Sequence, residues 1–291
     1  SNFWSKIGII DATPEGRGSL PVTDYQQTIL GRQSNFGDTG LPIEIYEGQE
    51  GSYLESGFTQ WGASGLAAVW AEENTRESIY NAFRRKETFA TTGSRIKVRF
   101  FGGYEIDDVF NKEDPINYAY LNGVTMGSDL FQSENKIPQF MVWALRDLKR
   151  APLDRVQIIK GWTELSGKPH EKIYDVACAD GRRPDSKTKL CRDTRAKVNL
   201  NNCRISKNLG ADELKAVWQD PDFDPNLKAF YYVRVLENPT CRWSSWDAIK
   251  SGEIPRADLP ATIQERAWSS PIWYIPDNEG ITIGNILPDD I

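Results

Sequence analysis

The stretch GASGLAAVWAEENTRESIYNAFRRKETFATTGSRIKVRFFGG, residues 62–103, contains the strongest structural signals of the chain. Residues 66–71 form a short apolar run that is typical of a buried strand. Asn74 and Glu77 then have the spacing of a capping box, and apolar residues at helical spacing follow them. Residues 95–101 alternate charged and apolar side chains, as a half-buried strand does. We therefore predict a strand, a capped helix and a new strand, which form the last β/α unit of one domain and lead into a β domain.

Residues 68–103 of this stretch resemble the signature of the domain of unknown function 3604 family. A second block, DPDFDPNLKAFYYVRVLENPTCRW at residues 220–243 followed by TIQERAWSSPIWY at residues 262–274, is similar to the same family. The resemblance covers about residues 6–276. The family is related to the PHP (polymerase and histidinol phosphatase) metal-dependent phosphoesterases, and its members begin with a further barrel segment that carries His-rich metal motifs. The resemblance thus implies the C-terminal half of a longer protein, and the opening Ser1-Asn2 looks like a cloning remnant.

These patterns predict an α+β chain with two domains. Residues 1–93 are expected to form the C-terminal β/α units of a PHP-like barrel, with a long Gly-rich loop over residues 24–61. Residues 94–291 are expected to form an immunoglobulin-like β-sandwich, because short strand patterns recur there between turns. The predicted strands cover residues 95–101, 123–129, 139–147, 155–163, 172–178, 229–237 and 271–275.

Composition limits the classes of function. The formal net charge of −6 argues against a nucleic-acid-binding surface, which needs a basic stripe. No apolar run approaches the length that a transmembrane helix requires, so no membrane span is predicted. The many aromatic residues are mostly expected in the core, although some of them could form a platform on which a sugar ring stacks.

Four cysteines, Cys178, Cys191, Cys203 and Cys241, all lie in the second half of the chain. They lack the close spacing of a metal site, which favours two disulfides and a periplasmic or secreted protein. Three pairings are open, and we favour Cys191 with Cys203 and Cys178 with Cys241. The alternative is four reduced thiols in a cytosolic protein.

The family resemblance places an Asp-x-His metal motif shortly before a Leu-Pro pair, and here Glu15, Gly16 and Arg17 occupy that place. Glu15 could still offer a carboxylate to a metal. Arg17 stays protonated and cannot bind one, but it could hold a phosphate or pair with Glu15. A divalent metal is therefore expected in the intact parent rather than in this chain alone.

Glu72 and Glu73 follow the predicted strand, where β/α barrels carry their active residues. Two carboxylates there could bind a metal or act in acid–base catalysis. The simpler interpretation is that they stabilise the positive end of the following helix.

Other polar motifs receive structural interpretations. His170 is the only histidine, and its predicted hairpin places it on the surface, where it is poorly suited to a catalytic triad. Residues 180–208 form a basic excursion that is either an anion-binding loop or a solvated loop held by a disulfide. The motif DPDFDP at residues 220–225 departs from an EF-hand and is expected to form turns. The motif QERAW at residues 264–268 is expected to dock the sandwich onto the barrel.

The preferred function is the C-terminal part of a PHP-like metal-dependent phosphoesterase or related hydrolase of unknown substrate, which is not catalytic by itself. Its partner would be the missing N-terminal barrel segment. The alternative is an exported β-sandwich module that binds a glycan, another small molecule or a protein through exposed aromatic side chains. A third interpretation is a sandwich that only stabilises the barrel.

Overall fold

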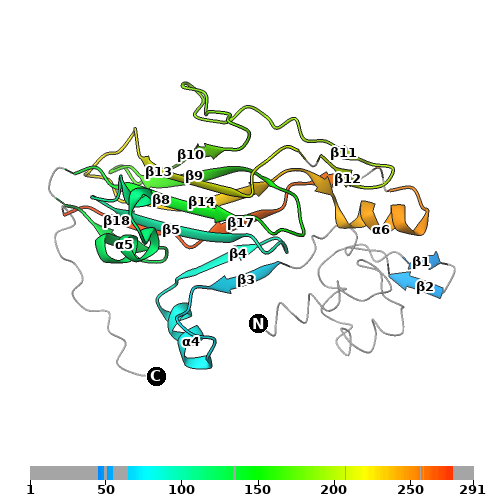
Figure 1. Cartoon of the computed structure of the whole chain (residues 1–291), viewed down its shortest axis with the longest axis horizontal. Helices are drawn as coiled ribbons and strands as arrows, with labels where there is room; N and C mark the ends of the chain where they lie inside the picture. The colour runs from blue at the N-terminus through cyan, green and yellow to red at the C-terminus, as the bar shows by residue number, and fades with distance from the viewer. Residues whose placement is uncertain are drawn as a thin grey trace.

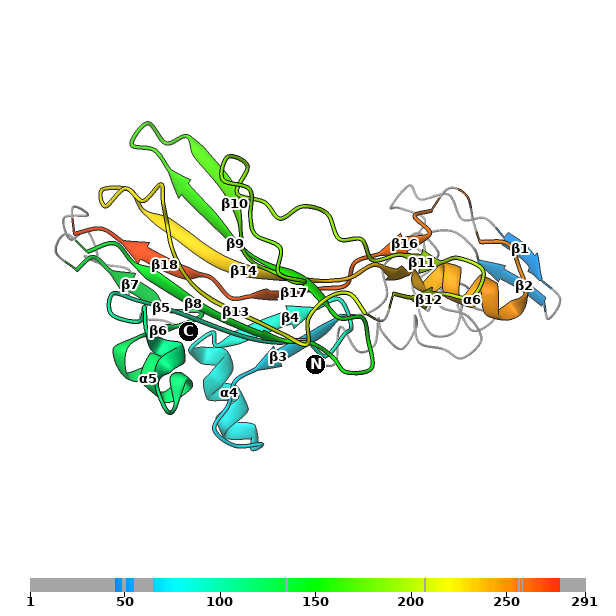
Figure 2. The ribbon, with the colours of Figure 1, turned by 45° about the horizontal axis from the view of Figure 1, so that its top comes forward.

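A computed structural model describes residues 65–133, 136–206, 208–255, 257 and 259–277, together with the backbone of residues 45–48 and 51–54. Its main body consists of two β-sheets packed face to face, and helices flank them (Figures 1 and 2). None of the helices in these ranges is long and apolar enough to cross a membrane.

The larger sheet has eight strands, which come from both ends and from the middle of the main body. Six strands follow in the order β10-β9-β14-β17-β4-β3, and β18 joins β14 to β7. Every pairing is antiparallel except that of β18 with β7. Their bounds are β3 (Leu66–Val69), β4 (Thr88–Thr91), β7 (Asp129–Phe131), β9 (Leu153–Thr163), β10 (Pro169–Cys178), β14 (Ala229–Glu237), β17 (Arg266–Ser269) and β18 (Ile272–Ile275).

The smaller sheet has four antiparallel strands, β13 (Glu213–Gln219), β8 (Gln139–Leu145), β5 (Lys97–Gly103) and β6 (Gly123–Thr125), in that order. Side chains alternate between its two faces. Val98 and Phe100 enter the main core between the sheets, where they meet residues of the larger sheet such as Val233. Phe101 points the other way, into a second cluster on the outer face.

Within the described residues, three α-helices and one 3₁₀ helix accompany the sheets: α4 (Arg76–Arg84), η1 (Val109–Asn111), α5 (Pro115–Asn122) and α6 (Trp243–Ser251). Helix α5 begins with Pro115 and is capped by Asp114, which accepts a hydrogen bond from the Asn117 amide. Buried residues of α5 and η1 form the outer cluster with β5 and β8. Helix α5 and η1 therefore cover part of the smaller sheet's outer face, and Figure 2 shows α5 beside β5 and β6.

Three two-stranded sheets complete the described elements. They are β1 (Ile45–Gly48) with β2 (Gly51–Leu54), β11 (Val198–Asn199) with β12 (Arg204–Ile205), and β15 (Thr240–Cys241) with β16 (Thr262–Ile263). In Figure 2 the last two pairs lie near α6.

The predicted PHP-like barrel end is wrong for the described residues. β3 and β4, on either side of α4, pair antiparallel, whereas a β/α barrel unit requires parallel strands. β4 then pairs with β17 and extends the larger sheet. The prediction took residues 95–101, which belong to β5, as the strand after the helix and missed β4, which precedes it. Periodicity also does not encode strand direction. Sheets of eight and four strands also depart from the seven to nine strands of an immunoglobulin-like sandwich.

The local predictions were more accurate. Each of the seven predicted strands has a counterpart, and a helix follows β3 as expected. The helix begins one residue later than the capping box predicts, because the Thr75 hydroxyl, rather than Asn74, accepts a hydrogen bond from the Ser78 amide. The run at β3 is not buried, and Leu66 is exposed.

Two disulfides form, as predicted, but the favoured pairing is wrong. The bonds join Cys178 to Cys191 and Cys203 to Cys241. Cys178 ends β10, and the following loop folds back so that the Cys191 amide donates to Asp175 on the same strand. The 13-residue separation of this pair is therefore closed locally.

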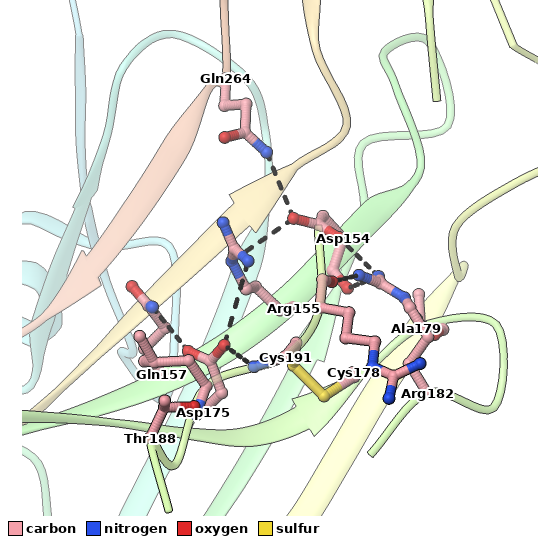
Figure 3. The surroundings of a disulfide bond; sticks show 12 residues. Asp154, Arg155, Gln157, Asp175, Cys178, Ala179, Arg182, Thr188, Cys191 and Gln264 are labelled. Atoms are coloured by element: carbon pink, nitrogen blue, oxygen red, sulfur yellow. Dashed lines mark hydrogen bonds and ion pairs between the residues drawn. A yellow bond between two sulfur atoms is a disulfide. The ribbon is translucent and has the colours of Figure 1, made fainter. Parts of the chain in front are cut away.

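Figure 3 shows this disulfide beside a buried polar cluster. Arg182 of the loop donates to the Asp154 carboxylate across 2.6 Å and to three backbone carbonyls. Gln157 donates to Asp175 across 2.6 Å. Hydrogen bonds of Arg182 and Asp175 thus hold the loop against the larger sheet. These contacts and the disulfide support the interpretation of residues 180–208 as an excursion held by a disulfide.

Candidate functional site

A pocket of about 160 Å³ opens on the outer face of the smaller sheet. The residues that line it come from the end of β3, from β5, from β8 and from α5: Trp70, Lys97, Arg99, Ile116, Trp143 and Leu145. Register places Lys97 opposite Leu145 and Arg99 opposite Trp143 on neighbouring strands. Because alternate residues of a strand share a face, the sheet presents all four of these side chains to the pocket.

Trp70 forms one wall and is fixed to the backbone of β5. Its indole nitrogen donates to the Val98 carbonyl oxygen across 2.7 Å. β6 pairs with β5 only from Phe101 onward, so Val98 lies where that edge of β5 has no strand partner. The Trp70 amide also donates to the Glu87 carbonyl oxygen across 3.0 Å. The indole therefore occupies a fixed position.

Arg99 lies flat against this wall. Its guanidinium carbon is 3.5 Å from the centroid of the Trp70 ring, which is a close cation–π contact. One guanidinium nitrogen donates to the Tyr120 hydroxyl across 2.6 Å and lies 3.4 Å from a Glu87 oxygen. The arginine is thus held by groups on three different elements.

Glu87 anchors the network behind the pocket. Its side chain is 1% exposed and accepts hydrogen bonds from Arg85, Arg99, Tyr120 and Thr125. Two guanidinium groups compensate the buried negative charge, which would otherwise be very costly. Burial, together with the hydrogen bond to Glu87, raises the pKa of Tyr120 to about 12. Tyr120 therefore acts as a neutral donor at physiological pH.

Trp143 forms the second wall. Its indole nitrogen donates to the Glu213 carboxylate across 2.5 Å. Phe110 packs edge-on against it with 5.8 Å between ring centroids, and the Lys215 ammonium lies 5.4 Å from the Trp143 ring. Both indole walls are therefore held in place by hydrogen bonds, and cationic side chains surround them.

Glu72 lies next to this network without lining the pocket. Its exposed carboxylate forms an ion pair with Arg85 at 2.9 Å and accepts a hydrogen bond from Ser78. A backbone hydrogen bond, the Ser78 hydroxyl and the Arg85 charge hold the pKa of Glu72 below its usual range. The Glu73 amide donates to the Ser78 hydroxyl, and its side chain is exposed. These contacts assign both residues to the start of α4.

The structure does not assemble a metal site from the predicted residues that it describes. No group of three or more His, Cys, Asp or Glu side chains is close enough to hold a metal within the described ranges. Glu15 and Arg17 lie outside those ranges.

His170 and the QERAW motif lie away from the pocket residues in the sequence and make contacts of their own. The His170 ring stacks on Trp162 and its Nε2 is 2.6 Å from Glu164. Gln264 donates to Asp154 and to the Glu237 carbonyl, and the Thr92 hydroxyl donates to Glu265. The motif thus connects strands of the larger sheet instead of docking on a barrel.

Sequence reasoning missed the pocket residues, although one signal was present. Arg95, Lys97 and Arg99 alternate along one predicted strand and place three cations on one face. A solvated face of this kind is ordinary. The face becomes a candidate site because the Trp70 indole, which is distant in the sequence, packs against Arg99. This contact depends on tertiary structure.

The family model described as "Protein of unknown function (DUF3604)" matches residues 5–276, which include every residue of the pocket. The chain belongs to this family. No curated protein and no solved structure matches the chain. Membership of the DUF3604 family therefore assigns no activity, and a function has to be inferred from the geometry of the pocket.

Proposed function

We propose that this DUF3604 chain is a carbohydrate-binding module, and that the pocket between Trp70 and Trp143 takes one ring of an acidic glycan. The observation that carries the proposal is the pair of fixed indoles beside Lys97 and Arg99 on one open sheet face.

The size of the pocket supports a single-ring ligand. At about 160 Å³ it is smaller than the roughly 300–1,000 Å³ of pockets for drug-sized molecules. The Trp143 indole offers apolar surface to the C–H face of a sugar ring, whereas Arg99 covers one face of Trp70. The ordered positions of both indoles reduce the entropy lost on binding. An open face of this kind also allows neighbouring sugars to extend beyond the pocket.

The charges favour an acidic sugar over a neutral one. Lys97 is exposed at the rim, and Lys215 lies beside Trp143. Arg99 is largely committed to Glu87 and Tyr120, so its main role is to support Trp70. A carboxylate or sulfate on the sugar would form a charge-assisted contact with Lys97.

The test is calorimetric titration of the chain with acidic oligosaccharides, such as uronic-acid oligomers, and with neutral oligomers of equal length. We expect binding of the acidic oligomers that falls about tenfold in Trp143→Ala, since truncation of a central aromatic typically costs more than about 1 kcal/mol. Lys97→Gln should reduce the preference for acidic over neutral oligomers. Trp246→Ala, at a 40%-exposed indole on α6, is the matched control. Equal affinities for wild type and Trp143→Ala would contradict the proposal.

Two disulfides are compatible with an extracellular or periplasmic location, and we propose export for this reason. A hydrolase-like activity of a longer parent stays a prediction from the family resemblance. Assays of the intact parent with phosphomonoesters and phosphodiesters, with divalent metals supplied, would test it.

A further inference from the structure

A second polar cluster, independent of the pocket, lies between the two sheets. Lys160 on β9 is 4% exposed, and Asp220, directly after β13, is 2% exposed. The Lys160 Nζ is 2.6 Å from Asp220 Oδ2. A lysine and an aspartate are thus held in contact where water has little access.

The Asp220 carboxyl group is oriented by two further donors. The Tyr231 hydroxyl donates to Oδ2 across 2.8 Å, and the Asp222 amide donates to Oδ1 across 2.9 Å. The Lys160 ammonium also donates to the Asp222 carbonyl oxygen across 2.7 Å. The amine, the carboxyl carbon and the donors to both oxygens are therefore fixed relative to one another.

Aromatic side chains surround this pair. Tyr231 is fully buried, with its ring centroid 4.3 Å from that of Phe140. Trp218 packs on Tyr174 at 4.9 Å, and the Trp162 ring is 5.0 Å from the Lys160 nitrogen. Removing two charges from water is costly, and in such surroundings the loss of both charges lowers the free energy of the folded chain.

We propose that Lys160 and Asp220 condense into an intramolecular isopeptide bond. A proton passes from the ammonium to Asp220 Oδ2, which leaves a neutral amine and a neutral carboxylic acid. The amine nitrogen then attacks the carboxyl carbon, and the charge that develops on Oδ1 is stabilised by the Asp222 amide. The Tyr231 hydroxyl assists departure of Oδ2 as a general acid and recovers its proton from the nitrogen.

The step balances without another reagent. The ammonium and the carboxylate together carry three protons. One proton stays on the amide nitrogen, two leave on Oδ2 as water, one N–C bond forms and one C–O bond breaks. Because the product is neutral, the buried charges and their desolvation penalty disappear together.

A neighbouring pair provides an internal comparison. Lys172 is 2.5 Å from Asp222, but these side chains are 41% and 50% exposed. Water stabilises both charges there, so the ammonium keeps its proton and has no free electron pair with which to attack the carboxyl carbon. We therefore expect the Lys172–Asp222 pair to stay ionic.

The test is the intact mass of the full chain after reduction and denaturation. The expected result is a mass lower than that of the sequence by one water molecule. Tryptic mapping should then recover the Lys160 peptide joined to the Asp220 peptide. The full sequence mass after prolonged incubation of folded protein would overturn the proposal.

Mapping is necessary because Asp180-Gly181 can lose water by forming a succinimide. Loss of water at that site, or a link at Lys172, would also contradict the assignment. Lys160→Arg keeps the positive charge but should restore the full mass. Tyr231→Phe keeps the ring and should slow formation of the bond, measured as the linked fraction against time after refolding. Equal rates for Tyr231→Phe and wild type would remove Tyr231 from the proposed step.

Discussion

Trp70 and Val98 are 28 residues apart and are joined by a 2.7 Å hydrogen bond from the indole nitrogen to the backbone carbonyl oxygen. The contact takes the place of a strand partner at an edge of β5. It also sets the indole against which Arg99 packs.

Trp70→Phe should lower the free energy of unfolding by about 1 kcal/mol, because the ring remains but the Val98 oxygen loses its donor. Urea denaturation followed by circular dichroism measures the change. Trp246→Phe removes an indole whose side chain is 40% exposed and should leave stability nearly unchanged. Equal effects of the two substitutions would show that the hydrogen bond contributes little.

Glu87→Gln should destabilise the chain by about 2 kcal/mol, since it leaves Arg85 and Arg99 without their buried counter-charge. The estimate is below that for a fully buried pair because both arginines retain solvent contact. Glu72→Gln removes the exposed partner of Arg85 and is the matched control, for which we expect no measurable change. A stable Glu87→Gln variant would mean that the arginines find solvent or other partners.

The chain should lose stability as pH rises from about 4.5 to about 8. Burial raises the pKa of Glu237 to about 8, and the nearby Glu265 and Asp147 add to the rise, while Ser94 and Arg150 oppose it. The folded state keeps this proton after the unfolded state, with its ordinary pKa, has released it, so stability falls between the two pKa values.

Urea midpoints measured across this pH range test the expectation. The Glu237→Gln substitution removes the carboxyl group that titrates in this range, so the stability of the variant should fall less as pH rises. Glu73→Gln, at an exposed side chain, should leave the profile of the wild type intact. A wild-type profile that rises with pH and is unaltered by Glu237→Gln would contradict the assignment.

Removal of the Cys203–Cys241 bond by paired serine substitutions should cost about 4 kcal/mol, and removal of the Cys178–Cys191 bond about 3 kcal/mol, if loop entropy dominates. The order follows from the separations of 38 and 13 residues. Thermal unfolding of the two double variants measures the loss of stability in each. The reverse order would show that the polar contacts around Cys191 depend on its disulfide more than loop length suggests.

Local patterns predicted the strands well because period-two alternation reports which residues face a core. They could not predict that β3 and β4 are antiparallel, since strand direction depends on how the chain turns in space. Strands β4, β13 and β17 were also missed. β17 spans only four residues and holds its place through β14 and β4 on either side.

The disulfide pairing and the pocket could not be predicted from the sequence for a related reason. Cys203 meets Cys241 only because the β11–β12 hairpin returns toward β15, and no spacing rule encodes that return. Trp70 and Trp143 lie 73 positions apart and become two walls of one pocket only through the pairing of β5 with β8. Glu72, which the sequence did single out, is connected to the pocket by Arg85 and Glu87.

The Cys203–Cys241 bond closes a covalent ring that contains β13 of one sheet and β14 of the other. A protease that cuts once inside this ring cannot release either fragment, because the disulfide still joins them. The two layers of the molecule are therefore connected by covalent bonds as well as by their shared core, and a single nick leaves one molecule in place of two.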